Sequence, residues 1–456
     1  MARDFTPKEY QDIAIAFMRE TPRCALFAGM GLGKTVSALT LAELLFFTGT
    51  TSPVLVLGPL RVARDTWPNE VRKWNHLRHM HIAPIVGDKT ARLAALHQRA
   101  EIFTINYENL PWLLEALGNR PWPFRTVIAD ESSKLKGFRI KQGGKRAHAL
   151  SNIVYQTDRW INLTGTPAAN GLKDLWGQFW FLDQGKRLGR THEAFMTRWF
   201  TMGYDRVMKP TQSASREIYA AIDDITLAIR PEDWFDLEKP IENQVRVTLP
   251  EGARKLYKKL EKDMFITLAC GTEVEAFNAA ALTNKCRQLA NGAIYTEEGK
   301  WSPVHDEKLD ALDSVIEEAG GAPVMVAYDF RTDLARILQR FKDAVDISTP
   351  KGYKQFINGE KQIGVAHPAS MGHGIDGLQE VCNRLVYFGH DWNLETRQQI
   401  LERIGPTRQK QSGFDRPVWV TSIVCDDTLD DVVLERHVSK RETQDLLMEA
   451  MSKRGI

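Results

Sequence analysis

A chain of 456 residues with an apolar share of 43% can bury large cores, and its length indicates roughly two to four domains. A formal net charge of +2 excludes the overall basicity that by itself marks a nucleic-acid-binding protein. The apolar segments are too short to cross a membrane, no signal-like apolar run follows the N-terminus, and the five cysteines are scattered. We therefore expect a cytoplasmic protein without a membrane partner.

The first strong feature is a glycine-rich segment between an apolar run and a helix-like run. Residues 24–27 are apolar, residues 36–47 have a helical pattern, and between them lie Gly29, Met30, Gly31, Leu32, Gly33, Lys34 and Thr35. A strand, a glycine-rich turn and a helix opening with Lys-Thr predict a phosphate-binding loop, because backbone N–H groups can cradle phosphate oxygens at a helix N-terminus. We expect these seven residues to bind a nucleotide, with Lys34 on the β- and γ-phosphates and Thr35 on Mg²⁺. The alternative is a glycine turn that only joins a strand to a helix, which the Lys-Thr pair disfavours.

Two further candidates flank this loop along the chain. Gln11 lies upstream, and its amide can donate to and accept from an adenine edge at once, although a surface polar residue is the simpler interpretation of a lone glutamine. Downstream, residues 53–59 predict a buried strand that stops at a proline. Arg61 leaves the carboxyl end of that strand, where ligands bind in open parallel sheets. Trp67 and Trp74 follow at helical spacing, and we interpret both as core residues.

Polar residues follow three more predicted strands. Residues 101–108 form a strand that reaches Asn106 and Tyr107. The apolar residues 124–129 run into Asp130 and Glu131, and a carboxylate pair after a buried strand can serve a bound nucleotide. We assign Asp130 to the metal and Glu131 to the attacking water. Residues 160–167 form a strand whose end carries Thr164 and Thr166, which could link the carboxylates to a moving element; a plain strand-to-loop turn is the alternative.

The second half of the chain predicts another lobe. Residues 171–236 contain aromatic clusters and charge but no train of strands, so we expect helices packed on the first core. Beyond them, strands alternate with helices, which predicts a second parallel sheet; the strands are residues 244–250, 323–328, 362–367 and 384–388.

The motifs occur in the order found in superfamily-two helicases, and the chain resembles their Swi/Snf-type branch. The resemblance rests on Gln11, residues 29–35, Asp130-Glu131 and residues 163–170, together with the positions of Trp67, Glu70 and Trp74 after Pro59-Leu60. Asp-Glu-Ser-Ser in place of Asp-Glu-Ala-His resembles the compact versions of bacteriophage and prokaryotic genomes.

This resemblance implies an α/β fold of two RecA-like lobes with parallel sheets. We expect residues 1–170 to form the ATP-binding lobe, residues 171–236 a helical insertion, and residues 237–456 the second lobe. It also implies a place in the cytoplasm of a bacterial or phage-infected host cell.

Two segments of the second lobe resemble motifs V and VI of the family. Residues 370–379 carry glycines that allow close approach to a phosphate chain, and Asp376 stands there as a cofactor-binding candidate. In residues 399–409, Arg403 has the expected offset from Gln399. Pro406 occupies the usual place of a second arginine, and Arg408 lies two residues further on. The resemblance implies that Arg403 and Arg408 are arginine fingers.

The implied function is an ATP- and Mg²⁺-dependent translocase on double-stranded DNA rather than RNA, with an ATPase activity that nucleic acid stimulates. We expect a monomer whose catalytic residues are Lys34, Asp130, Glu131, Arg403 and Arg408. The candidate nucleic-acid contacts, mainly to phosphates, are Arg61, Asn106, Tyr107, Thr164, Arg331 and Ser370.

Three alternatives use the same phosphate loop. The first is a strand-separating helicase, or the motor of a restriction, defence or phage replication system with a nuclease or replication factor as its protein partner. The second is a nucleotide-switched nucleic-acid-binding protein with little turnover, which the intact Lys34, Thr35, Asp130 and Glu131 disfavour. The third is a phosphoryl-transfer kinase, which leaves the second lobe unexplained.

Overall fold

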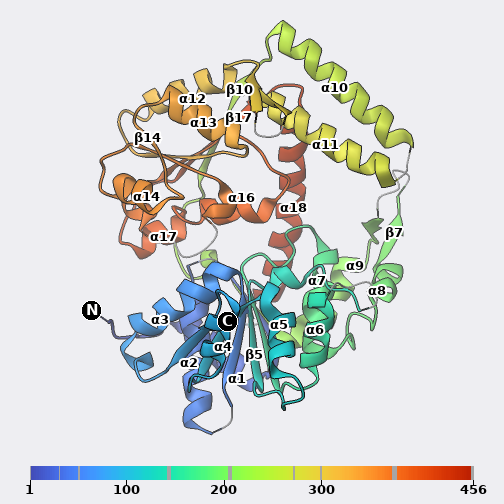
Figure 1. Ribbon diagram of the computed structural model, residues 1–456, viewed down its shortest axis with the longest axis vertical. Coiled ribbons are helices and arrows are strands. Elements are labelled where there is room, and N and C mark those ends of the chain that lie inside the picture. Colours follow the sequence, from blue (N-terminus) through green and yellow to red (C-terminus); the bar gives the residue numbers. More distant parts are fainter. Residues whose placement is uncertain are drawn as a thin grey trace. The chain divides into compact units, whose positions relative to one another are not determined.

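The computed structural model describes residues 2–29, 31–49, 52–140, 145–203, 208–270, 273–297, 300–371 and 377–452. The chain divides into two compact units, one made of Met1–Asp236 with Lys440–Ile456 and the other of Leu237–Ser439. Each unit contains a sheet with helices around it (Figure 1). Within the described residues, no helix is long and apolar enough to span a membrane.

The sheet of the first unit has seven strands in the order β3-β4-β2-β5-β6-β1-β9, and all neighbours are parallel. Its strands are β1 (Arg23–Ala28), β2 (Val54–Gly58), β3 (Ile82–Ile85), β4 (Ile102–Asn106), β5 (Thr126–Asp130), β6 (Arg159–Thr164) and β9 (Thr226–Ile229).

The apolar runs of these strands are buried on both sides of the sheet. Along β1, Cys24, Leu26 and Ala28 belong to one core cluster, and Ala25 and Phe27 belong to another. The first cluster is completed by α1, α2 and α3, and the second by α5, α6 and α7, so helices cover both faces (Figure 1). This arrangement explains why the strands are almost continuously apolar rather than alternating.

The helices of the first unit are α1 (Glu9–Glu20), α2 (Lys34–Phe47), α3 (Trp67–Lys73), α4 (Lys89–Leu96), α5 (Leu110–Leu117), α6 (Lys145–Val154), α7 (Leu175–Asp183), α8 (His192–Trp199) and α9 (Ala214–Ile222). The helices of the second unit are α10 (Glu251–Cys270), α11 (Glu273–Ala290), α12 (Glu307–Glu318), α13 (Arg331–Arg340), α14 (Pro350–Ile357), α15 (Leu378–Val381), α16 (Leu394–Leu401) and α17 (Pro406–Gln411). The last helix, α18 (Leu429–Ser452), begins in the second unit and ends in the first.

Residues 171–236 differ from the expected helical insertion. Their helices α7, α8 and α9 join the core of the first unit, as expected, but β9 pairs with β1 as an edge strand of the sheet. A short hairpin of β7 (Phe200–Met202) and β8 (Met208–Pro210) lies between α8 and α9. The segment therefore completes the first unit instead of forming a separate domain, and the units divide between Asp236 and Leu237.

The second unit has a six-stranded parallel sheet in the order β10-β17-β16-β13-β15-β14. Its strands are β10 (Ile241–Val247), β13 (Val324–Ala327), β14 (Ala344–Asp346), β15 (Ile363–Ala366), β16 (Arg384–Tyr387) and β17 (Trp419–Cys425), and β11 (Ala293–Glu297) pairs separately with β12 (Lys300–Pro303).

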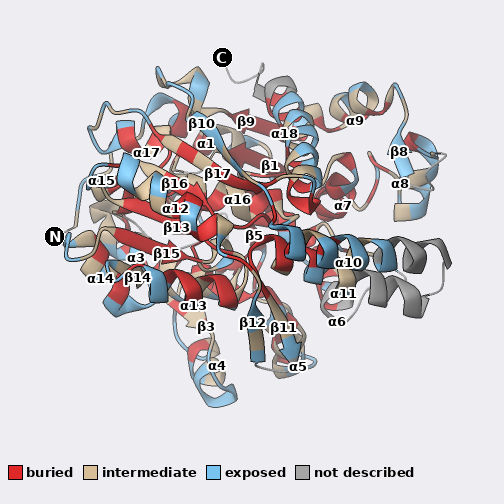
Figure 2. Ribbon diagram, turned by 90° about the horizontal axis from the view of Figure 1, so that it is seen from above, coloured by how far each residue is buried: buried red, intermediate tan, exposed pale blue. Residues whose placement is uncertain are grey.

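The strands of this sheet also contribute to two cores. Val324 and Val326 pack with residues of α12 and α13, while Met325 and Ala327 pack with residues of α14, α15 and α16. Figure 2 shows the buried residues concentrated in the strands and on the helix faces turned toward them. Two separate parallel-sheet units confirm the predicted α/β class.

Candidate active site

The predicted phosphate-binding loop joins β1 to α2 in the first unit. Gly31 and Gly33 have φ angles of 83° and 79°, a region that side chains other than glycine rarely adopt. The Lys34 ammonium donates to the carbonyls of Ala28 at 2.7 Å and Gly29 at 3.2 Å, so the lysine lies along the loop. Thr35 follows it in the first turn of α2, and Met30 lies outside the described residues.

Gln11 connects α1 to this loop. Its Oε1 accepts from the Lys8 backbone N–H at 2.9 Å, and its Nε2 donates to the Leu32 carbonyl at 3.2 Å. A Cβ atom at Gly33 would lie 2.3 Å from that Nε2, so any residue larger than glycine would require the Gln11 amide to move. The structure thus gives Gln11 a role in holding the loop, and its contact with adenine remains a prediction.

The end of β9 supports the loop from the other side, which the sequence did not predict. The Gly29 N–H donates to the Ile229 carbonyl at 3.2 Å, and a Cβ atom at Gly29 would lie 2.7 Å from the ring of Pro231. The Trp234 ring is 5.5 Å from that of Tyr10, beside Gln11.

Asp130 is the last residue of β5, and three donors hold it. Its Oδ1 accepts from the Glu131 N–H at 3.0 Å, its Oδ2 accepts from the Trp67 indole at 2.8 Å, and its carbonyl accepts from the Tyr107 hydroxyl at 2.9 Å. Asp130 and Glu131 are 7% and 8% exposed. The carboxylate therefore has a fixed direction within a nearly dry site.

Glu131 has a φ of 53°, in the left-handed region. For a residue with a Cβ this conformation costs roughly 1–2 kcal/mol, and such strain concentrates at functional sites. The strained turn allows the chain to leave β5 sharply, so two successive carboxylates are presented at one edge of the sheet.

The loop and the carboxylates lie at the same edge of one sheet. Parallel strands have their carboxyl ends together, and β6 alone separates β1 from β5, which places the two strand ends about 10 Å apart. Mg²⁺ is usually held by one or two carboxylates with phosphate oxygens and waters rather than by a cage of protein ligands. Asp130 and the Thr35 hydroxyl fit that donor set, and the described residues contain no cluster of three acidic, His or Cys side chains that would form such a cage.

A buried polar network surrounds the end of β6. Thr164 is fully buried, and its hydroxyl accepts from the Thr166 N–H at 3.1 Å. Gln178 of α7 accepts from the Ser132 hydroxyl at 2.9 Å and donates to the Pro167 carbonyl at 2.7 Å. Through Gln178, the turn after β6 is tied to the segment that follows the carboxylates.

The predicted nucleic-acid contacts of the first unit fall into two groups. Asn106, Tyr107 and Thr164 are buried and bonded inside the protein, so their side chains stabilise the strand ends instead of facing a phosphate chain. Arg61 is half-buried at the end of β2. Of these four residues, Arg61 alone remains a candidate for contact with nucleic acid.

In the second unit, Arg331 and Ser370 follow the carboxyl ends of β13 and β15, whereas Arg403 and Arg408 lie between β16 and β17. Arg331 is exposed at the first position of α13, and the Ser370 hydroxyl donates to the His367 carbonyl at 2.7 Å after β15. Arg403 is buried just after α16, and its Nε donates to the Met371 carbonyl at 2.8 Å. Arg408 is half-buried on α17. Asp376 lies outside the described residues.

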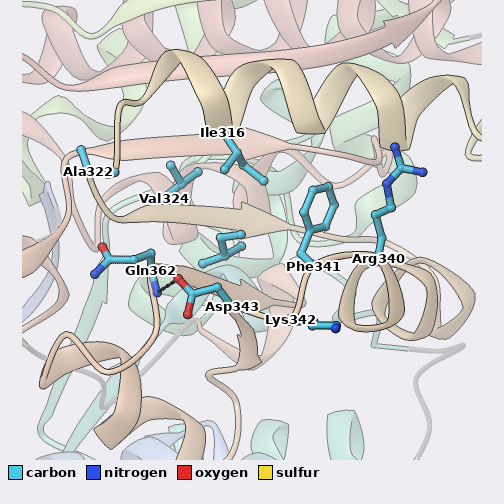
Figure 3. Close-up of a pocket in the computed structure, with 10 residues that line it drawn as sticks. Ile316, Ala322, Val324, Arg340, Phe341, Lys342, Asp343 and Gln362 are labelled. Atoms are coloured by element: carbon cyan, nitrogen blue, oxygen red, sulfur yellow. Dashed lines mark hydrogen bonds between the residues drawn. The ribbon is translucent and has the colours of Figure 1, made fainter.

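A pocket of about 430 Å³ lies at the opposite edge of the second sheet (Figure 3). Val324 and Ile363, the first residues of β13 and β15, form part of its wall, and Arg340 and Asp343 stand at its rim. Ligands bind open parallel sheets at the carboxyl ends of the strands, so this pocket is separate from the predicted motifs.

Comparison with known proteins identifies the family. The SNF2-related domain family matches residues 10–291. A protein designated p41, from Acyrthosiphon pisum secondary endosymbiont phage 1, is 48% identical over 466 residues, which cover 99% of this chain and 100% of that protein. The chain belongs to the SNF2-related family, and the predicted Swi/Snf-type branch of superfamily two is confirmed.

Cellular relatives are more distant and longer. DNA excision repair protein ERCC-6-like of Bos taurus is 32% identical over 192 residues, which cover 40% of this chain and 15% of that protein. The ISWI chromatin-remodeling complex ATPase ISW2 of Saccharomyces cerevisiae is 23% identical over 458 residues, which cover 92% of this chain and 38% of that protein. The chain therefore spans well under half the length of either.

Two solved structures match this chain over most of its length. The helicase domain of Pyrococcus furiosus Hef matches with a TM-score of 0.51 at 16% identity, covering 95% of this chain and 98% of that one. A Sulfolobus solfataricus SWI2/SNF2 ATPase core in complex with dsDNA matches with a TM-score of 0.45 at 21% identity, covering 99% and 94%. The Hef match supports the predicted architecture of two RecA-like lobes.

Proposed function

We propose that this chain is a motor that hydrolyses ATP and moves along double-stranded DNA. The observation that carries the proposal is the joint geometry of the loop before α2 and of Asp130-Glu131, which meet at one edge of a parallel sheet. A phosphate-binding loop alone binds a nucleotide, whereas a buried and oriented carboxylate pair beside it provides for hydrolysis.

Each nucleotide-facing residue has a separate role. The N–H groups at the N-terminus of α2 and the Lys34 ammonium bind the β- and γ-phosphates. Thr35 and Asp130 would hold Mg²⁺, which neutralises charge on those phosphates. Glu131 orients the attacking water and accepts its proton. From the second unit, Arg403 and Arg408 stabilise the negative charge that develops on the γ-phosphate.

The proposed track is DNA, bound mainly at its phosphates. The names of two relatives, a DNA excision repair protein and a chromatin-remodeling ATPase, refer to DNA or to its packaged form. The remaining candidate contacts, Arg61, Arg331 and Ser370, follow the ends of strands, and their side chains can donate hydrogen bonds to phosphate oxygens rather than read base edges. We therefore expect binding with little sequence preference and with strong dependence on salt.

The test is the rate of ATP hydrolysis with and without duplex DNA. We expect stimulation of at least several-fold, no nucleotide binding by Lys34→Ala, and ATP binding without turnover by Glu131→Gln. Equal rates with and without DNA or RNA would contradict the motor. Displacement of a triplex strand without unwinding of a forked duplex would establish tracking on duplex DNA, and the reverse result would indicate strand separation.

A further inference from the structure

The indole of Trp67 forms a direct hydrogen bond to the carboxylate of Asp130. Trp67 is completely buried, at 0% exposure, and its Nε1 lies 2.8 Å from Asp130 Oδ2. Hydrogen bonds to ionised groups are about twice as strong as neutral ones, and in a nearly dry site they fix the direction of the acceptor. With Oδ1 held by the Glu131 N–H, both carboxylate oxygens have a defined donor.

The position of Trp67 depends on an irregular turn before α3. Residues Val62–Thr66 form a π-helical turn, and Trp67 is the first residue of the regular helix. Single π-turns are rare and frequently occur at functional sites, because the additional residue changes which side chains face inward. The Thr104 hydroxyl of β4 donates to the Ala63 carbonyl, so the turn is anchored to the sheet.

We infer that Trp67 is a positioning residue for the metal site: it holds the Asp130 carboxylate in the orientation that binds Mg²⁺. The inference rests on the proposed function, since it assigns Asp130 to the metal. The indole occupies one lone pair of Oδ2, and a carboxylate has about four lone-pair sites, so this hydrogen bond is compatible with metal binding. Phenylalanine keeps an apolar aromatic ring at this position, although a smaller one, but has no N–H group to hold the carboxylate.

The same helix provides a matched control. Trp74, at the C-cap of α3, also donates its indole N–H to a carboxylate, Glu70 Oε2, at 2.6 Å. Trp67→Phe and Trp74→Phe therefore each remove one indole–carboxylate hydrogen bond from the same element. Only the first removes it from Asp130.

The experiment measures the affinity for ADP by calorimetry, once with Mg²⁺ and once with EDTA. For the wild type and Trp74→Phe we expect Mg²⁺ to increase the affinity. For Trp67→Phe we expect the affinity in EDTA to be unchanged and the Mg²⁺-dependent increase to be at least tenfold smaller. The same increase in Trp67→Phe and Trp74→Phe would overturn the inference, whereas no increase in the wild type would overturn the proposed nucleotide and metal site.

Two further variants test the inference if Trp67→Phe does not fold. Trp67→His retains a ring N–H donor in a smaller side chain, and we expect it to recover part of the Mg²⁺-dependent increase. If Trp67→Phe is unfolded in a thermal melt, Trp67→His is compared with the apolar variant Trp67→Leu by the same calorimetry. Equal Mg²⁺ responses of these two variants would then overturn the inference.

Discussion

The ammonium of Lys308 lies 2.6 Å from Oδ2 of Asp430, and the side chains are 0% and 2% exposed. Lys308 belongs to α12, and Asp430 lies in the first turn of α18. The ammonium also donates to Asn291 Oδ1 at 2.8 Å and to the Phe388 carbonyl at 3.2 Å, and Asp430 accepts from the Cys425 N–H at 3.0 Å. This pair therefore joins two helices to two strand ends within the second unit.

Replacing Lys308 should destabilise the second unit strongly. Lys308→Met leaves the Asp430 carboxylate buried without its counter-charge, and breaking such a pair costs about 3–5 kcal/mol in the free energy of unfolding. Urea unfolding followed by circular dichroism measures the loss. Lys255→Met is the control, because Lys255 and Glu251 form an ion pair of 2.6 Å at 76% and 84% exposure, and its removal should have little effect. Equal losses in the two variants would contradict the role of burial.

The Lys308–Asp430 pair should also make the stability of the fold depend on pH. Burial alone would raise the pKa of Asp430, but Lys308 and then His390 lower it below its ordinary value. An acid with a depressed native pKa contributes stability above its unfolded pKa of about 4, and that contribution is lost as the pH falls through the native pKa. The difference in stability between the wild type and Lys308→Met should therefore shrink as the pH falls. It should begin to shrink above about pH 4, because the buried carboxylate of the variant has lost its counter-charge and binds a proton more readily, and it should continue to shrink through the native pKa of the wild type.

Asp333 should make the stability of the fold depend on pH in the opposite direction to Asp430. It is completely buried in α13, and its Oδ2 accepts from Asn291 Nδ2 at 2.9 Å and from the Phe330 N–H at 2.9 Å. Burial raises its pKa to about 7, although the Phe330 N–H opposes the shift. A carboxyl with a raised native pKa stabilises the fold most at low pH, and this contribution is lost between about pH 4 and pH 7.

Asp333→Asn tests this effect. The variant keeps the acceptor oxygen and has no charge to bury, so its melting temperature relative to the wild type should rise from pH 5 to pH 8. The full change in the free energy of unfolding is on the order of 4 kcal/mol. Asp313→Asn, at a 42% exposed side chain, is the control. A relative melting temperature that does not vary with pH would show that Asp333 does not titrate in this range.

Gly33→Ala should disturb the nucleotide site, because its methyl group would displace the Gln11 amide. Gly33 and Gly49 both have positive φ angles, 79° and 64°, so alanine meets similar backbone strain at each. Only at Gly33 would the Cβ atom crowd a neighbour, the Gln11 amide at 2.3 Å; nothing lies within 4 Å at Gly49. We expect Gly33→Ala to weaken ADP binding at least tenfold and Gly49→Ala to leave it unchanged. If crowding is the cause, Gly33→Ala should weaken ADP binding less in a Gln11→Ala background than in the wild type.

Arg403→Ala and Arg408→Ala should differ in their effect on the stability of the protein. Arg403 is buried and bonded to the Met371 carbonyl, so Arg403→Ala should lower both the melting temperature and kcat. Arg408 is half-buried on a short helix, so Arg408→Ala should lower kcat at an unchanged affinity for ATP, as a transition-state contact does. Lys410→Ala, at a surface pair with Asp415, serves as the control. If one arginine variant keeps a normal kcat, the other residue is the finger.

The parallel-sheet strands with long apolar runs could be predicted from the sequence. β2, β4, β5 and β13 are buried on both faces, so each is a continuous apolar run bounded by turn residues. The unpredicted strands gave weaker signals for physical reasons. β3 contains Pro84 and lies at an edge, and β14 has three residues. In β17, Trp419–Cys425, the polar residues Thr421 and Ser422 interrupt the apolar run.

Within the site, the sequence identified residues whose chemistry is carried by their type and spacing. Lys34, Asp130 and Glu131 are of this kind, since a phosphate loop and a carboxylate pair after a strand each have a local signature. The sequence predicted Trp67 only as a core residue. The helical spacing of apolar residues indicates that a side chain is buried, but it does not show whether the indole N–H has a hydrogen-bond partner such as Asp130. Pro231 is 202 residues beyond Gly29, and such long-range packing has no local pattern.

The π-helical turn Val62–Thr66 makes the length of this segment as important as its composition. A π-helical turn contains one residue more than an α-helical turn, so deleting one residue within it would let it relax to a regular helix with Trp67 still on the side of Asp130. Each further deletion would rotate the later side chains of α3 by about 100° around the axis and would turn Trp67 away from Asp130. Among related chains, substitutions and single-residue deletions within residues 62–66 should therefore be tolerated, whereas longer insertions and deletions between the end of β2 and the tryptophan should be rare.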